Sequence, residues 1–224
     1  MTRNILSLFI IAATCLTFGA CRKYSPVEND HQVGISKITY YPIVAIKGDR
    51  LMIISQGSTF TDPGVVSTVN GQPVTPTITG SVNTAVPGVY GITYSATNTD
   101  GYAASDWRTV VVIGSDVAAN DYSGTYIRNA TGVTSTWTKT ATGVYNVDNP
   151  GGASVGKGYI VVVVNYTGSK ISIPMQLATD PNSGSTGIVS SSSETYSPNA
   201  TPPQYSWIFH AGGYGTALRT FIKQ

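Results

Sequence analysis

The stretch from Leu51 to Ile113 constrains the fold most strongly, because its apolar residues recur with the period of a β-strand. Tyr90, Ile92 and Tyr94 alternate with glycine, threonine and serine, so one face of this segment is apolar and the other polar. This alternation is typical of a half-buried antiparallel strand. From Trp107 onward apolar residues occupy both faces, as they do in a strand inside a β-sandwich. The stretch therefore predicts a compact all-β module.

Turn sequences separate the expected strands of this module. Asp62-Pro63-Gly64 supplies a proline with a preset φ, followed by a glycine that tolerates positive φ, which is the chemistry of a tight turn. Asn70-Gly71 is a strong signal for a two-residue hairpin. Pro73 cannot donate a ladder hydrogen bond, so we expect its strand at a sheet edge.

The composition of the whole chain supports an all-β fold and argues against nucleic acid as a partner. After Cys21 no long segment carries apolar residues at helical spacing. The formal net charge is only +2, with charged residues at 11%. Binding to phosphates requires clustered Lys and Arg, which this chain does not have.

The N-terminal residues are typical of a secretory leader that ends at a cysteine. Arg3 precedes an apolar run from Ile5 to Phe18, and small residues lead to Cys21. The pattern resembles the lipobox of bacterial lipoproteins, although Phe18 stands where that family usually has an aliphatic residue. The resemblance implies a lipoprotein signal peptide over residues 1–20, lipidation of Cys21, and the membrane as a partner through the N-terminal lipid.

Residues 21–33 are polar and without periodicity, which predicts a flexible tether. Surface-displayed lipoproteins of Bacteroidetes type often carry acidic residues directly after the cysteine, but Arg22 and Lys23 stand here. We expect a lipid-anchored protein of the outer membrane, exposed at the cell surface. The unusual basic pair leaves the periplasmic face open as an alternative.

Three phrases of the first module resemble a known bacterial repeat. They are Phe60-Thr-Asp-Pro-Gly-Val65, Pro87-Gly-Val-Tyr-Gly-Ile-Thr-Tyr94 and Arg108-Thr-Val-Val-Val112. In this order they are similar to an immunoglobulin-like (Ig-like) repeat of bacterial surface proteins, related to hyalin repeats. The resemblance implies a β-sandwich over residues 34–114 that serves as a spacer or adhesion module, with no catalytic residues to carry over.

A second antiparallel β domain, either a barrel or a sandwich, is expected over residues 118–224. Short apolar or alternating segments are separated there by Gly, Asn, Pro and Ser. The closing segment from Tyr205 to Lys223 resembles the C-terminal halves of uncharacterised Bacteroidetes-type lipoproteins. The expected strands are Gly124–Arg128, Thr134–Thr140, Val144–Val147, Tyr159–Asn165, Lys170–Leu177, Gly187–Ser191, Tyr205–His210 and Thr216–Ile222.

Residues that could perform chemistry are scattered through the second domain. No pair of its acidic residues sits in a recognisable motif, and no G-x-S-x-G elbow between a strand and a helix accompanies His210. We therefore expect no enzyme, no metal site and no cofactor. A hydrolase that uses His210 or paired carboxylates stays a minor alternative.

Aromatic rings are the best candidates for ligand binding, because they can stack on sugar faces. The candidate ligand-binding residues are Trp137, Tyr126, Tyr145, Trp207 and Tyr214. Most such rings fill a small β core, but Trp137 has polar neighbours and is the one we expect outside it. The leading hypothesis is a non-catalytic binding or adhesion protein for a polysaccharide or a surface protein. A barrel that encloses a small apolar ligand is the alternative.

Overall fold

The computed structural model describes residues 32–33 and 36–224. The expected signal peptide, Cys21 and most of the expected tether lie outside these described residues. The described residues up to Tyr40 carry two short strands, β1 (Gln32–Val33) and β2 (Ser36–Lys37), which pair antiparallel. Residues Tyr41–Gln224 form a separate compact unit. No helix of the described chain is long and apolar enough to cross a membrane.

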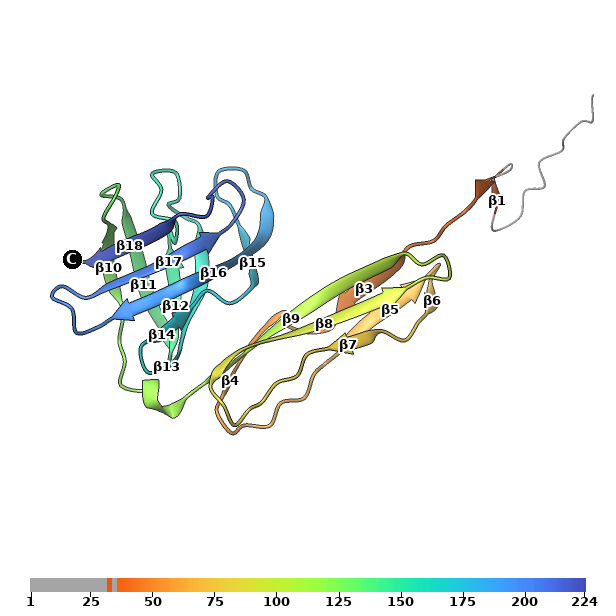
Figure 1. The fold of residues 1–224 in the computed structure, drawn as a ribbon, viewed down its shortest axis with the longest axis horizontal. Helices are drawn as coiled ribbons and strands as arrows, with labels where there is room; N and C mark the ends of the chain where they lie inside the picture. The colour runs from red at the N-terminus through yellow and green to blue at the C-terminus, as the bar shows by residue number, and fades with distance from the viewer. Residues whose placement is uncertain (1–31, 34–35) are drawn as a thin grey trace, which may run out of the picture. The chain divides into compact units, whose positions relative to one another are not determined.

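Strands β3 to β9 form the two sheets of a β-sandwich, as expected for an Ig-like module (Figure 1). One sheet has the order β3-β5-β6 and the other the order β4-β9-β8-β7. Ile92, Tyr94 and Val110 are buried between them. Strand β4 pairs parallel to β9, whereas the other pairs in these sheets are antiparallel. The strand bounds are β3 (Pro42–Ile46), β4 (Leu51–Ser55), β5 (Val65–Val69), β6 (Gln72–Pro73), β7 (Thr77–Thr79), β8 (Gly88–Thr97) and β9 (Ala103–Ile113).

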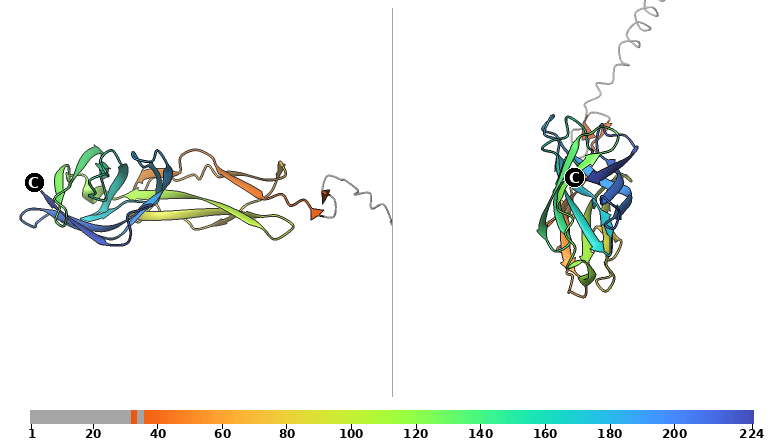
Figure 2. Two further views of the ribbon diagram at one scale, coloured as in Figure 1. Left: turned by 90° about the horizontal axis from the view of Figure 1, so that it is seen from above. Right: turned by 90° about the vertical axis from the view of Figure 1, so that its left-hand side faces the viewer.

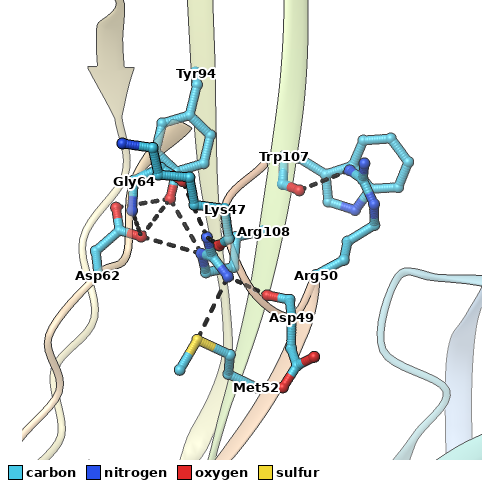
Figure 3. A network of polar contacts seen from close by, with 9 residues as sticks. All are labelled: Lys47, Asp49, Arg50, Met52, Asp62, Gly64, Tyr94, Trp107 and Arg108. Atoms are coloured by element: carbon cyan, nitrogen blue, oxygen red, sulfur yellow. Dashed lines mark hydrogen bonds and ion pairs between the residues drawn. The ribbon is translucent and has the colours of Figure 1, made fainter. Parts of the chain in front are cut away.

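The Asp62-Pro63-Gly64 turn is held by a buried arginine (Figure 3). Arg108, on β9, is fully buried, and its Nε donates to Asp62 Oδ1 at 3.0 Å. Its Nη2 donates to the carbonyl of Lys47 at 2.6 Å and to that of Gly64 at 3.2 Å, and its Nη1 donates to the carbonyl of Asp49. The turn residues of the bacterial repeat are therefore fixed by a charge from the last strand of the module.

The carboxylate of Asp62 accepts hydrogen bonds from several groups besides Arg108. The carboxylate accepts from the Tyr94 hydroxyl at 2.7 Å and from the backbone N–H of Gly64 at 3.0 Å. Burial alone would raise the pKa of Asp62, but these hydrogen bonds and the charge of Arg108 outweigh burial and hold it below the ordinary value. Asp62 therefore remains ionised opposite Arg108 at neutral pH.

The remaining strands form one curled nine-stranded sheet of order β14-β13-β12-β11-β10-β18-β17-β16-β15, seen from two further sides in Figure 2. The expected strand Lys170–Leu177 is divided in two, because Pro174 interrupts the ladder where it cannot donate a hydrogen bond. The strand bounds are β10 (Gly124–Arg128), β11 (Thr134–Ala141), β12 (Val144–Asp148), β13 (Ile160–Thr167), β14 (Lys170–Ser172), β15 (Gln176–Thr179), β16 (Thr186–Ser197), β17 (Gln204–His210) and β18 (Leu218–Lys223).

A side chain joins the two ends of the curled sheet. The side-chain amide of Gln176 accepts from the N–H of Val162 at 2.9 Å and donates to the carbonyl of Val162 at 2.7 Å. It therefore makes the two hydrogen bonds to β13 that the backbone of a neighbouring strand would otherwise make. Ser191 and Ile173 bond each other nearby, through Ser191 N to the Ile173 carbonyl at 3.1 Å. The concave face is consequently closed around a core of aromatic and aliphatic side chains.

The segment between the two β modules is a 3-10 turn, η1 (Ser115–Val117), with a buried Val117. Val117 packs in a cluster with Ile113 and with Val164 of β13. Thr109 Oγ1 also donates to the carbonyl of Met175 at 2.7 Å. The segment between the modules is thus packed against the second module, and the division into domains 34–114 and 118–224 stays a prediction.

Candidate functional site

Trp137, Tyr126, Tyr145 and Trp207 all lie in the core of the second β module. Trp137 is only 2% exposed and stacks on Trp207 at 5.7 Å between ring centroids. The expectation that Trp137 stands outside the core is wrong. Its neighbour on the same face, Ser135, is also fully buried and bonds the Asp148 carbonyl, so polar neighbours in the sequence did not mean a solvated strand.

Tyr214 differs from the other candidates, because it is half-buried and lines a surface hollow of about 430 Å³. We call this site the Tyr214 hollow. Its volume falls within the range of small-molecule sites. The lining residues come from the end of β10, from the start of β18 and from three loops, and they are Arg128, Gly151, Ala153, Val155, Asp180, Asn182, Gly212, Gly213, Tyr214 and Arg219.

Two arginines reach the hollow from the concave face of the sheet. Arg219 pairs with Trp207 across β18 and β17, and cross-strand partners lie on the same face. Arg128 follows Tyr126 by two residues on β10, so it shares the inward face with that buried ring. Both cations therefore stand at the end of a hydrophobic core, where solvent screening is reduced.

The two guanidinium groups have no carboxylate partner within ion-pair distance anywhere in the described chain. Arg219 is 5% exposed and donates only to backbone carbonyls, those of Ala217 at 3.0 Å and of Tyr214. The Nε atoms of both arginines are buried without a partner. Burial and the nearby charge of Arg128 lower the pKa of Arg219 below its ordinary value. Neither arginine of the site therefore has an ion-pair partner among the described residues.

Polar groups of the β15–β16 loop complete the hollow. The carboxylate of Asp180 accepts from the N–H of Asn182 at 2.9 Å and from Ser183 Oγ at 3.2 Å. Hydrogen bonds, first that of the Asn182 N–H, hold the pKa of Asp180 below its usual range. An ionised acceptor and an amide therefore line the same hollow as the two arginines.

Small residues of the β12–β13 loop make room for the Tyr214 ring. A Cβ atom on Gly151 would lie 2.1 Å from Cε1 of Tyr214, so the ring fits only against glycine. Asn149 holds this loop, since its side chain donates to the carbonyls of Thr134 at 2.9 Å and Ala153 at 3.0 Å. The β12–β13 loop therefore determines where the Tyr214 ring lies.

Sequence reasoning missed Arg128 and Arg219. The sequence pattern could have identified them, because each stands two positions from an aromatic residue that faces inward. Arg128 follows Tyr126, and Arg219 precedes Phe221. A charge at an inward position of an alternating strand is unusual and points to a functional or structural role. The sequence alone does not show that β10 and β18 are neighbours in the sheet and bring the two arginines to the same end.

Of the groups considered for a hydrolase, His210, Glu194 and Asp148 do not line the Tyr214 hollow, whereas Asp180 does. His210 Nε2 lies 2.7 Å from Ser192 Oγ, across β16 and β17. Glu194 accepts from Ser172 and Ser191, and Asp148 accepts from the N–H of Gly158 at 2.6 Å. Each carboxylate thus has a local partner. Among the described residues, no group of three His, Cys, Asp or Glu side chains could hold a metal ion.

Comparison with known proteins identifies the first module. Residues 44–112 match the family model described as bacterial surface protein, Ig-like domain. This match confirms the Ig-like resemblance and supports a place at the bacterial cell surface. No curated protein matches the chain.

Among solved structures, the chain is similar to a lipoprotein from Bacteroides thetaiotaomicron. The two share 22% sequence identity, over 82% of this chain and 100% of the other, with a TM-score of 0.36. A TM-score this low does not establish a common arrangement of the whole chains.

Proposed function

We propose that this surface protein is a lipid-anchored, non-catalytic binding protein of the bacterial envelope. In this proposal the Ig-like module is a spacer, and the second β module binds a glycan or a protein at the Tyr214 hollow. The observation that carries it is the hollow itself, where an aromatic ring meets two guanidinium groups that have no carboxylate partner within ion-pair distance in the described chain. Such convergence of a ring with a few polar groups is typical of ligand sites.

The packed interior of the second module favours surface binding over an enclosed apolar ligand. Tyr122 and Tyr196 stack at 3.9 Å between ring centroids, and Tyr205 stacks on Phe221 at 4.6 Å. Rings occupy the space that a lipocalin-like ligand would need. Ser192 and His210 give the hydrolase alternative a hydrogen-bonded pair, but no carboxylate bond that orients the imidazole is found in the described chain.

The anchor is tested by replacing Cys21 with serine in the full chain. Lipidation at Cys21 predicts that the wild-type protein sediments with membranes and that Cys21→Ser moves to the soluble fraction. Retention of the variant in the membrane fraction would contradict the anchor.

Ligand binding is tested on a glycan and protein array, with protein that is expressed from the full chain with its own leader. We expect Tyr214→Ala to lose the binding signal, because the ring is a wall of the hollow. Tyr102→Ala is the matched control, since Tyr102 is an aromatic residue 49% exposed on the other module. Equal signals from wild type and Tyr214→Ala, for every ligand bound, would exclude the hollow as the site.

A further inference from the structure

The charges of the Tyr214 hollow restrict what it can bind. Arg128 and Arg219 lie close enough that the charge of one lowers the pKa of the other. Holding two like charges at the edge of a core costs free energy unless an anion or strong acceptors compensate them. Both arginines donate to backbone carbonyls, and those that accept from Arg128, at Gly151 and Gly152, lie at a long 3.4 Å. A bound anion would supply the missing counter-charge.

The remaining walls of the hollow fit a sugar better than a simple ion. Tyr214 offers part of a ring for stacking against a sugar face. Asp180 and Asn182 line the hollow near it and suit hydroxyl groups, which both donate and accept hydrogen bonds. Arginine is also the residue best suited to two parallel hydrogen bonds with a planar carboxylate or with a sulfate.

We infer that the Tyr214 hollow binds an acidic sugar, with the carboxylate or sulfate of a glycan placed against Arg128 and Arg219 and the sugar ring against Tyr214. This inference rests on the proposed function and narrows it from any glycan or protein to an anionic glycan. The two guanidinium groups, which bond only backbone carbonyls, are then a preformed anion site.

The test compares glycans that differ only in the acidic group. Calorimetric titration of the full chain uses oligogalacturonate against its methyl ester, and a sulfated galactan oligomer against its desulfated form, across a panel of such matched pairs. We expect the acidic member of at least one pair to bind about 10-fold tighter or more, because hydrogen bonds to charged groups are the strong ones. The preferred pair tells a carboxylate from a sulfate ligand.

Substitutions of the two arginines test whether the preference for the acidic glycan depends on the Tyr214 hollow. Arg128→Gln is expected to lower affinity for the acidic glycan about 10-fold and so to reduce the difference in affinity between the acidic and the neutral glycan of the pair. Lys170→Gln is the matched control, because it removes one positive charge from an exposed position on β14 and should change affinity little. Arg219→Lys keeps the charge and loses the guanidinium fork, and melting curves check that each variant folds.

The outcomes separate this inference from the function on which it rests. Equal affinity for the acidic and neutral members of every pair, with binding still lost in Tyr214→Ala, would overturn the acidic sugar and leave the binding function intact. Equal weakening by Arg128→Gln and Lys170→Gln would also overturn it, since the effect would then be one of net charge. Absence of binding to every glycan of the panel would overturn it as well.

Discussion

Asp62 and Arg108 form an ion pair at 3.0 Å between residues 46 positions apart, and this contact ties the Asp62-Pro63-Gly64 turn of the Ig-like module to its last strand. Arg108 is completely buried, whereas the Asp62 side chain is 24% exposed. Breaking a buried pair leaves an uncompensated charge, which costs more than the pair itself contributes. We therefore expect Asp62→Asn to destabilise the protein by about 3 kcal/mol.

The measurement is urea unfolding followed by tryptophan fluorescence. Asp49→Asn is the matched control, because Asp49 is exposed in the same region and only its backbone carbonyl contacts Arg108. The control should unfold at the wild-type midpoint. A wild-type midpoint for Asp62→Asn as well would show that Arg108 does not need this counter-charge.

The lowered pKa of Asp62 predicts a dependence on pH. The folded state holds the carboxylate ionised below the ordinary pKa of about 4, so the stabilisation is complete above that pH. It is lost as the pH falls through the lowered pKa of the folded state. The difference in unfolding free energy between wild type and Asp62→Asn should hence be largest near neutral pH and shrink on acidification. A difference that stays constant down to pH of about 2 would contradict this linkage.

The structure also explains why sequence reasoning succeeded for the strands and failed for Trp137. Strand positions followed from alternation and turn residues, which act locally. Trp137 was misplaced because its strand buries Ser135, whose hydroxyl is satisfied by the Asp148 carbonyl and by Tyr205. A buried serine with partners far away in the chain looks the same in the sequence as an exposed one.

The same limit applies to charged residues. The pattern around Arg108 places it on a strand just before an apolar run, but it does not identify Asp62 as the partner. Arg128 and Arg219 come together only because β10 and β18 are neighbours in the sheet. Such pairings depend on the order of the strands in the sheet. A single sequence without helices or disulfide-forming cysteines to constrain it does not determine that order.

Trp137 is expected to act on stability, because its ring lies among other buried rings. Trp137→Ala should lower the unfolding free energy by about 4 kcal/mol through the cavity that it leaves. Trp137→Phe keeps most of the ring and should cost clearly less. Calorimetric melting of both variants checks this. Similar losses for the two substitutions would argue against a packing role.

Gln176 is expected to hold the curled sheet closed. Gln176→Leu keeps a similar volume but leaves the N–H and carbonyl of Val162 without this partner, so we expect a loss of about 2 kcal/mol. Gln204→Leu, at an exposed position of β17, is the control. Hydrogen exchange should show faster exchange at Val162 in Gln176→Leu alone. Unchanged protection at Val162 would mean that the side chain does not close the sheet.

Gly151 is expected to control the shape of the Tyr214 hollow. An alanine there would place a methyl group within 2.1 Å of the Tyr214 ring, so the ring must move. Gly151→Ala should weaken ligand binding about as much as Tyr214→Ala. Gly212→Ala is the control, since it lines the same hollow and its added Cβ would meet nothing within 4 Å. If Gly212→Ala weakens binding and Gly151→Ala does not, the ring position is irrelevant.

The most direct test of a ligand site at the Tyr214 hollow is a crystal structure of the chain with the glycan that binds it most tightly. Our account predicts the acidic group within about 3 Å of the guanidinium nitrogens of Arg128 or Arg219, and a sugar ring against Tyr214. A glycan bound elsewhere on the molecule, with both guanidinium groups still without an anion, would contradict it.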